Sequence, residues 1–115
     1  MTDPVFVFGS NLAGKHYGGA ARYAHQMHGA VMGEGIGHQG NSYAIPTCDD
    51  TIAALPLVRI KPHIDAFIDY AKAHPELEFH LTHIGCGIAG YDWNRDIRPM
   101  FPAELPENIT ILEPL

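Results

Sequence analysis

Two short apolar runs in this sequence each end in a glycine-rich segment, and each segment leads into a helical pattern. The first run covers residues 5–8 and is followed by the glycine-rich residues 9–19. The second run covers residues 78–82 and is followed by three glycines within residues 83–91. Glycine lets the backbone approach a ligand closely, and the first turn of a helix has unpaired N–H groups, so this arrangement is typical of anion-binding loops. The alternative is that both segments only reverse the chain, as many glycine turns do.

We expect the two glycine-rich segments to face one crevice. Neighbouring parallel strands present their carboxyl ends at the same edge of a sheet, which is where open α/β sheets bind ligands. The residues predicted to bind a ligand come from both segments. They are Gly9, Ser10, Asn11, Gly18, Gly19 and Ala20 from the first segment, and Gly85, Cys86, Gly87, Ile88, Ala89, Gly90 and Tyr91 from the second.

Hydrophobic periodicity predicts four strands and three helices. Pro46 is expected to end the second strand, and Pro62 to lie in the first turn of the second helix. Asp92 is the predicted N-cap of the last helix. Residues 29–41 hold five glycines and are predicted to form a long loop, for which we expect the role of a flap over the crevice. The predicted strands are 5–8, 41–47, 78–84 and 108–112, and the predicted helices are 18–28, 61–73 and 93–100.

The alternation of strands and helices predicts an α/β fold. We expect three layers, α/β/α, around a largely parallel sheet. A chain of 115 residues can bury a core without disulfides or metals, so residues 1–115 are predicted to form a single domain. The hydrophobic fraction of 46% excludes a disordered chain.

Charge, hydropathy and cysteine content indicate which partners and which cell compartment to expect. The formal net charge is -6 and the seven lysines and arginines are scattered, so a nucleic acid is not expected as a partner. The sequence has neither an apolar stretch of about 18 residues nor a charged and then apolar leader, so we expect a cytoplasmic protein without a membrane segment. Cys48 and Cys86 are then free thiols. The sequence does not indicate the oligomeric state.

Three polar residues near the predicted crevice are candidates for catalysis. Asn11 follows the first strand and has the donors and acceptors to bind a ribose or to orient a water molecule, but asparagine also closes turns. His16 lies inside the first glycine-rich segment. Asp92 follows the second segment and has a carboxylate that can activate water, with helix capping as its other role. The ring of Tyr91 can stack on a base or a sugar, or pack in the core.

The sequence lacks a complete motif for a cysteine nucleophile, for a metal site or for a known nucleotide-binding loop. Cys86 lies at a predicted helix start, which lowers the pKa of a thiol, but His83 precedes it on an extended strand and is poorly placed as its base. His25 and His28 are spaced like two metal ligands, yet no HExxH pattern or Cys/His cluster completes a site, so no metal and no other cofactor is expected. The first segment matches neither a Walker loop nor the dinucleotide-binding fingerprint.

Two stretches of the sequence resemble the ligand loops of macro domains. Gly9-Ser10-Asn11 with Gly18-Gly19-Ala20-Ala21 is similar to the first loop, and residues 84–91, Ile-Gly-Cys-Gly-Ile-Ala-Gly-Tyr, are similar to the second loop, which wraps a diphosphate in that family. The order of elements between them also fits, so the resemblance covers about residues 5–112. It points to the compact macro-like proteins of phages and bacteria. Macro domains bind ADP-ribose or related nucleotides, and some hydrolyse ADP-ribosyl bonds.

The resemblance implies a module that binds an ADP-ribose-like molecule or a cyclic nucleotide signal, which the protein would sequester or sense. One alternative is a hydrolase of an ADP-ribosyl linkage, with Asn11, His16 or Asp92 placing a water molecule. The second alternative is a structural or partner-binding protein without a ligand. In the sequence as given, the upstream strands and the aspartate that hold adenine in that family have no counterpart, and the asparagine-rich signature is reduced to Asn11. The resemblance to macro domains therefore implies binding of the diphosphate and the distal ribose more strongly than it implies adenine recognition or hydrolysis.

Overall fold

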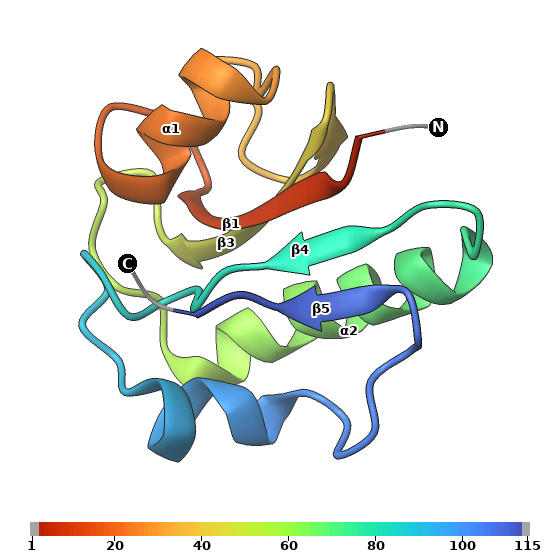
Figure 1. Cartoon of the computed structure of the whole chain (residues 1–115). Coiled ribbons are helices and arrows are strands. Elements are labelled where there is room, and N and C mark those ends of the chain that lie inside the picture. The colour runs from red at the N-terminus through yellow and green to blue at the C-terminus, as the bar shows by residue number, and fades with distance from the viewer. Residues whose placement is uncertain (1–2, 114–115) are drawn as a thin grey trace.

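The computed structural model describes residues 3–113 and has an α/β fold (Figure 1). Its mixed sheet of five strands has the order β2-β3-β1-β4-β5. The α/β class predicted from the sequence is therefore confirmed. The strands are β1 (Val5–Asn11), β2 (Gly37–Gln39), β3 (Ser42–Cys48), β4 (Phe79–Leu81) and β5 (Ile109–Ile111), and the helices are α1 (Gly19–Met27) and α2 (Leu57–Ala73). Two short helical turns, η1 (Trp93–Ile97) and η2 (Arg98–Met100), lie between β4 and β5.

The sheet is parallel except at one edge. β1 pairs with β3 on one side and with β4 on the other, and β4 pairs with β5, all in parallel. β2 runs antiparallel to β3. The prediction that residues 29–41 form only a loop is wrong for β2, because a three-residue strand gives no detectable periodicity.

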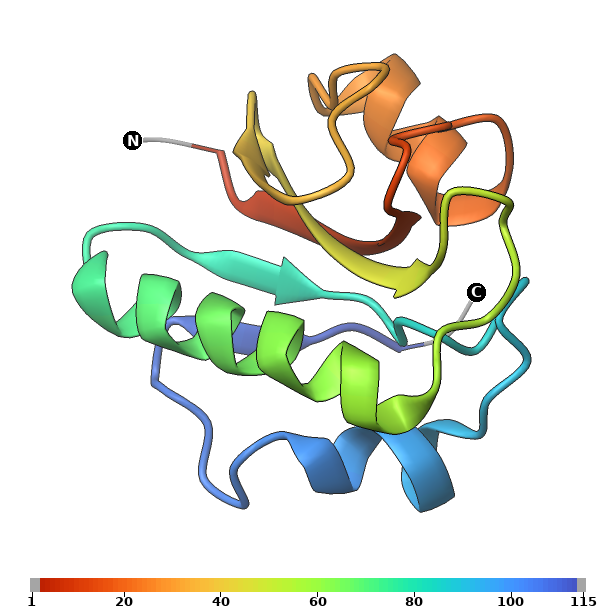
Figure 2. The ribbon, with the colours of Figure 1, turned by 180° about the vertical axis from the view of Figure 1, so that it is seen from behind.

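The side chains of the sheet alternate between two hydrophobic clusters. Val5 and Val7 of β1 belong to the larger cluster, which α2 and η1 cover, and Phe8 belongs to the smaller cluster under α1. Figures 1 and 2 show α1 on one side of the sheet and α2 on the other. Ala21 and Ala24 are the buried residues of α1, and their small side chains let the helix lie close to the sheet. This packing holds the glycine-rich start of α1 near the carboxyl end of β1.

β4 and β5 are buried on one face only. Phe79 and Leu81 belong to the larger cluster, whereas His80 between them points to the face that carries α1 and is half-buried. Thr110 of β5 is the register partner of His80 and is exposed. This alternation of apolar and polar residues is typical of strands with one solvated face. α1 does not extend over this half of the sheet (Figure 1).

Pro46 and Pro62, both expected at the ends of elements, lie inside them. The prediction that Pro46 ends its strand is wrong, because β3 continues to Cys48. Pro46 is the register partner of Ser10 in β1, but β2 pairs only with residues 42–44, so on that side no strand lies beside Pro46 to need its missing N–H. α2 begins at Leu57 rather than at residue 61, which places Pro62 in the helix interior. Pro62 is exposed, so the hydrogen bond that it removes is on the solvent side of the helix.

Other boundaries also differ from the predicted ones. β1 continues through Gly9 and Ser10 because these residues pair with β3, whereas β4 and β5 are shorter than predicted. The last helix is a π-helical turn followed by a 3-10 turn. The prediction that Asp92 caps this helix is confirmed, since its carboxylate accepts a hydrogen bond from the N–H of Arg95 at 2.7 Å. Within residues 3–113, no helix combines the length and the apolar character that crossing a membrane requires.

Candidate functional site

A cavity of about 200 Å³ lies at the carboxyl end of β1, between the two glycine-rich segments. Its wall includes all the predicted ligand-binding residues of the first segment, which are Gly9, Ser10, Asn11, Gly18, Gly19 and Ala20. From the second segment it includes Gly85, Gly87, Ile88 and Ala89. The structure thus brings residues that are more than 60 positions apart in the sequence to one cavity.

Four residues of the second segment that line this cavity, Gly85, Gly87, Ile88 and Ala89, have unpaired main-chain N–H groups. The N–H groups of residues 85–89 donate to no acceptor within residues 3–113. Two hydrogen bonds fold the segment and leave these groups unpaired: Gly90 N–H donates to Gly87 O at 3.0 Å, and Tyr91 N–H donates to Gly85 O at 2.8 Å. Gly85 has a φ of 76°, a conformation that favours glycine. Successive unpaired N–H groups in a turn form a concave surface that suits an anion.

The amino end of α1 adds a second set of unpaired N–H groups. The N-cap residue Gly18 has no side chain that could cap the helix, and no acidic residue lies in the first turn. The N–H groups of Gly19, Ala20 and Ala21 have no acceptor among the described residues, and the helical pattern begins with Arg22 N–H donating to Gly18 O at 3.2 Å. The described residues that line the cavity include no aspartate or glutamate. The positive end of the helix dipole therefore lies beside the cavity.

The two segments touch through their backbones. A Cβ atom on Gly9 would lie 3.3 Å from the main-chain N of Gly85 and 3.3 Å from Thr47 Oγ1. A side chain at this position would push the second segment away from β1. Glycine at position 9 therefore allows the two segments to form one continuous wall.

Asn11 lines the cavity but uses its side chain to close the first segment. Its Nδ2 donates to Lys15 O at 2.9 Å, and its Oδ1 accepts from Lys15 N–H at 2.8 Å. These hydrogen bonds correspond to the turn-closing role of asparagine. Lys15 also lines the cavity, and its Nζ donates to the main-chain carbonyl of Asp50 at 3.1 Å. Lys15 is the one lysine or arginine among the described residues that line the cavity.

His16 is a buried residue of the first segment and is not part of the cavity wall. Its Nε2 lies 3.0 Å from Glu34 O and must carry a proton, because a carbonyl oxygen can only accept. Its main-chain N–H donates to Met32 Sδ at 3.4 Å. Nδ1 has no hydrogen-bond partner in the part of the chain that is described. Through these hydrogen bonds His16 connects the first segment to residues 32–34.

Residues 29–41 support the first segment from outside and do not cover the cavity. None of them lines its wall, so the expectation that they form a flap is wrong. Gly33 N–H donates to Gly14 O at 2.9 Å, and Ser10 Oγ donates to Gly35 O at 2.5 Å. A Cβ atom on Gly35 would overlap with the carbonyl oxygen of Asn11. This close backbone packing fixes the position of the first segment.

Gly90, Tyr91 and Asp92 also lie outside the cavity wall. Tyr91 donates its hydroxyl to Leu55 O at 2.5 Å, and its ring packs against the larger hydrophobic cluster. Asp92 is occupied with capping η1, and Gly90 closes the turn with a φ of 79°. These three residues therefore anchor the second segment to the core.

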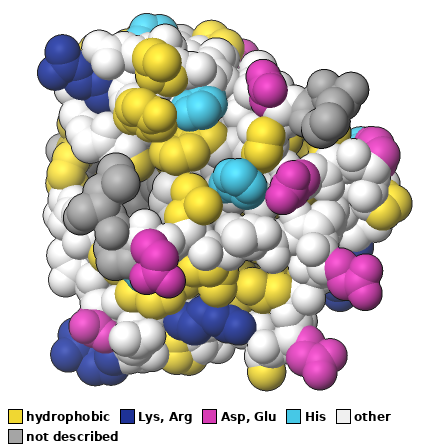
Figure 3. Space-filling view, in the orientation of Figure 1, with side chains coloured by type: hydrophobic (Ala, Val, Ile, Leu, Met, Phe, Trp, Pro, Cys, Tyr) yellow, Lys and Arg dark blue, Asp and Glu magenta, His cyan; other side chains and the backbone are white. Residues whose placement is uncertain are grey.

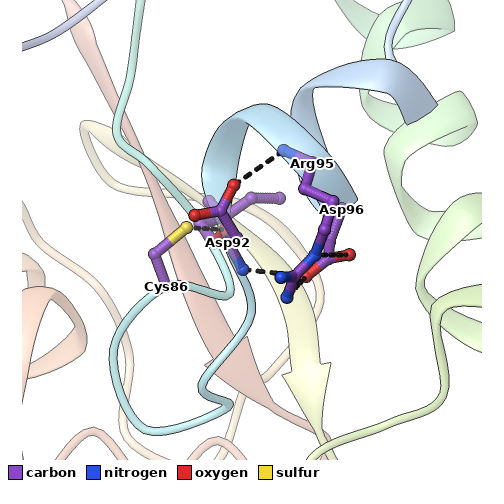
Figure 4. Close-up of polar contacts among 5 residues, drawn as sticks. Cys86, Asp92, Arg95 and Asp96 are labelled. Carbon is purple, nitrogen blue, oxygen red and sulfur yellow. Dashed lines mark hydrogen bonds and ion pairs between the residues drawn. The ribbon is translucent and has the colours of Figure 1, made fainter.

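Cys86 is the other predicted residue outside the cavity wall, and its thiol donates to Ile84 O at 3.4 Å (Figure 4). Burial raises the pKa of the Cys86 thiol, and the carboxylates of Asp92 and Asp96 raise it further. The expectation that a helix start lowers this pKa is therefore wrong, because two carboxylates are the charges that act on the sulfur. A protonated thiol is a weak nucleophile, which speaks against catalysis by Cys86.

We expect iodoacetamide to alkylate Cys86 slowly at about pH 7, because only the thiolate reacts and the raised pKa keeps the thiol protonated. The rate should rise as the pH increases. Replacing both Asp92 and Asp96 by asparagine removes the two carboxylates and should raise the rate at neutral pH. Mass spectrometry of tryptic peptides resolves Cys86 from Cys48. Alkylation of Cys86 faster than that of free cysteine would contradict this prediction.

Several residues of the cavity wall were not predicted from the sequence. Thr47 is the last but one residue of β3 and Thr82 follows β4, and both strands are neighbours of β1. The rule that ligands bind at the carboxyl ends of parallel strands would have pointed to them. Lys15 and Ile52 lie in loops, and no sequence signal marks them. The complete set is Lys15, Tyr17, Ala21, Thr47, Cys48, Ile52, Thr82, His83 and Ile84.

Comparison with known proteins does not place the chain in a family: no family model, no curated protein and no solved structure matches it. Within the described residues, no three His, Cys, Asp or Glu side chains are grouped so that they could hold a metal ion. The fold and the site therefore define the class of protein in structural terms. It is an α/β domain with a cavity rich in main-chain N–H groups at the carboxyl ends of β1, β3 and β4.

Proposed function

We propose that this protein binds an ADP-ribose-like nucleotide and holds its diphosphate between the two glycine-rich segments. The observation that carries the proposal is that residues with unpaired N–H groups, from the second segment and from the start of α1, line one cavity. Phosphate oxygens are strong acceptors, and each charge-assisted hydrogen bond contributes about 1.5–3 kcal/mol. The same cavity has no carboxylate among its described lining residues to repel an anion.

The net charge of -6 does not oppose this ligand. Local dipoles set the electrostatic potential inside a small cavity, so backbone N–H groups can bind a phosphate in an acidic protein. The ammonium group of Lys15 lies at the same wall and adds attraction for a phosphate. Binding should therefore depend less on salt than it does in a site built from several lysines and arginines.

The resemblance to macro domains supports the same ligand. In that family the loop that matches residues 84–91 wraps a diphosphate, and in this chain that segment has unpaired N–H groups. We extend the proposal to a three-layer, macro-like arrangement with α1 and α2 on opposite faces of the sheet. In a phage or bacterial cell, such a protein would sequester or sense a nucleotide.

We favour binding over hydrolysis of an ADP-ribosyl linkage. The side chain of Asn11 is engaged with Lys15, Asp92 caps η1, and His16 lies outside the cavity wall. A hydrolase needs a general base or a water-orienting group within hydrogen-bond reach of the reacting atoms. The three predicted catalytic residues are committed to structural hydrogen bonds instead.

The single tryptophan of the chain provides a direct test of ligand binding. Trp93 stacks on His83 with ring centroids 4.3 Å apart and planes 1° apart, and His83 lines the cavity. We expect ADP-ribose to change the Trp93 fluorescence in a saturable manner. It should also stabilise the folded state by about 2.7 kcal/mol at a ligand concentration 100 times the Kd, which thermal unfolding measures. An ADP-ribosylated peptide should be recovered intact after incubation with the protein.

Sodium chloride at equal ionic strength is the control for general salt effects on fluorescence. If neither ADP-ribose nor pyrophosphate changes the fluorescence or the unfolding temperature, the proposal fails and the glycine-rich segments are only turns. Release of free ADP-ribose from the peptide would instead favour the hydrolase.

A further inference from the structure

A second hollow of about 670 Å³ opens beside the cavity, on the face of the sheet that carries α1. Its wall includes Tyr23 of α1, His80 of β4 and Leu112, which follows β5, and α1 does not cover this half of the sheet (Figure 1). Phe6 of β1 and His80 of β4 are register partners, so their side chains point to the same face and both line the hollow. Its volume falls in the range of about 300–1,000 Å³ that is typical of small-molecule sites.

Three aromatic rings line this hollow as one group. The rings of Phe6 and His28 are stacked with centroids 4.7 Å apart, and Tyr23 meets them at 5.4 Å and 5.1 Å, edge-on to both. Figure 3 shows histidine and hydrophobic side chains gathered on this face of the molecule. Tyr23 is 48% exposed, so part of its ring remains open to a ligand. Rings that are fixed by one another offer a rigid surface on which a flat ring can stack.

The hollow carries little charge. His80, Cys86 and Leu112 also line it, and its described lining residues include no lysine or arginine. Glu113 is the single acidic residue among them. No lysine or arginine among these residues can pair with a phosphate, whereas a ring with N–H groups can donate to the carboxylate of Glu113. The surface therefore suits a nucleobase better than an anion.

The hollow and the cavity adjoin each other. Gly19, Ala20, Thr82 and His83 line both of them. A molecule with phosphates in the cavity can therefore extend past the start of α1 into the hollow. We propose that this hollow binds the base of the nucleotide, which makes the ligand a nucleoside diphosphate or its derivative rather than a sugar phosphate. This inference rests on the proposed function and assigns the base to side chains of β1 and α1.

Isothermal titration calorimetry of the full chain with ADP and with inorganic pyrophosphate tests the inference. We expect the wild type to bind ADP at least about 10-fold more tightly than pyrophosphate, because stacking of a base on aromatic side chains contributes this much. Tyr23→Ala should weaken ADP binding by about 10-fold and leave the affinity for pyrophosphate unchanged within about 2-fold. Tyr23→Phe keeps the ring and should bind both ligands like the wild type. Tyr23 is exposed on α1 and alanine favours helices, so the fold should persist.

The outcomes separate this inference from the proposed function. Equal affinity of the wild type for ADP and pyrophosphate overturns the base site and leaves the anion site standing. Equal losses for both ligands in Tyr23→Ala, or no loss for either, also overturn it. If the wild type binds neither ligand, the proposed function fails and the inference fails with it.

Discussion

Replacing Gly87 by valine should abolish nucleotide binding without unfolding the protein. Gly87 lines the cavity, and a Cβ atom there would meet no atom within 4 Å, so the new side chain takes up space that the ligand needs. It should keep phosphate oxygens away from the neighbouring N–H groups. The loss of two charge-assisted hydrogen bonds weakens binding by about 100-fold or more. Calorimetry with ADP-ribose measures the affinity, and thermal unfolding without ligand should match the wild type.

The matched control for Gly87→Val is Ala66→Val. Ala66 is exposed on α2 and lines neither the cavity nor the hollow. This variant also introduces a valine at an exposed position, and it should bind ADP-ribose like the wild type. If Gly87→Val kept its affinity, the second segment could not be the part that holds the diphosphate.

The second prediction with a large expected effect concerns the stability of the folded protein. Gly35→Ala should lower the free energy of unfolding by about 3 kcal/mol, the upper part of the usual range for overpacking. The added Cβ would overlap with the carbonyl oxygen of Asn11 and lie 3.0 Å from that of Leu12. Both are backbone atoms, so the first segment itself must shift. Urea denaturation should show a lower midpoint with an unchanged slope.

Gly87→Ala is the control for this stability change, because it adds the same methyl group in open space. It should change the free energy of unfolding by less than about 0.5 kcal/mol. Gly35→Ala should also weaken ADP-ribose binding, because the first segment forms one wall of the cavity. Wild-type stability of Gly35→Ala would show that residues 29–41 do not support that segment.

The helices and strands that could be predicted from the sequence are those marked by a pattern within a short stretch of the chain. The apolar run at residues 5–8 forms a strand, and the alanine-rich pattern after Gly19 forms a helix. The amphipathic pattern of α2 also holds, since Ile64, Phe67, Ile68 and Ala71 are all buried. Each signal depends on residues within one or two turns of the chain, so no knowledge of the packing is needed.

The incorrect predictions concern residues whose structure depends on contacts with a distant part of the chain. Pro46 is tolerated in β3 because β2 stops short of it, which the sequence around Pro46 cannot reveal. Gly9 and Ser10 extend β1 because β3 offers them a partner. Gly35 packs closely against the carbonyl oxygen of Asn11, and Gly33 donates its N–H to Gly14 O, so these two glycines hold the first segment in place.

The candidate site could be predicted only in part for the same reason. The glycine-rich segments mark the two walls, but Thr47 and His83 come from other strand ends. The roles of Asn11 and His16 follow from their hydrogen-bond partners, Lys15 and Glu34, and those partners are set by the loop conformation. Residue types alone could not distinguish a ligand contact from a structural contact.

The N–H groups of residues 85–89 affect how this region can be mapped by mutagenesis. Alanine scanning changes side chains and leaves every peptide N–H in place, so it would report small effects there even if a ligand were fully engaged. Proline, which lacks the N–H, and bulky residues at open positions are the informative changes. By the same logic, side chains in this turn can diverge between homologous proteins without loss of the interaction.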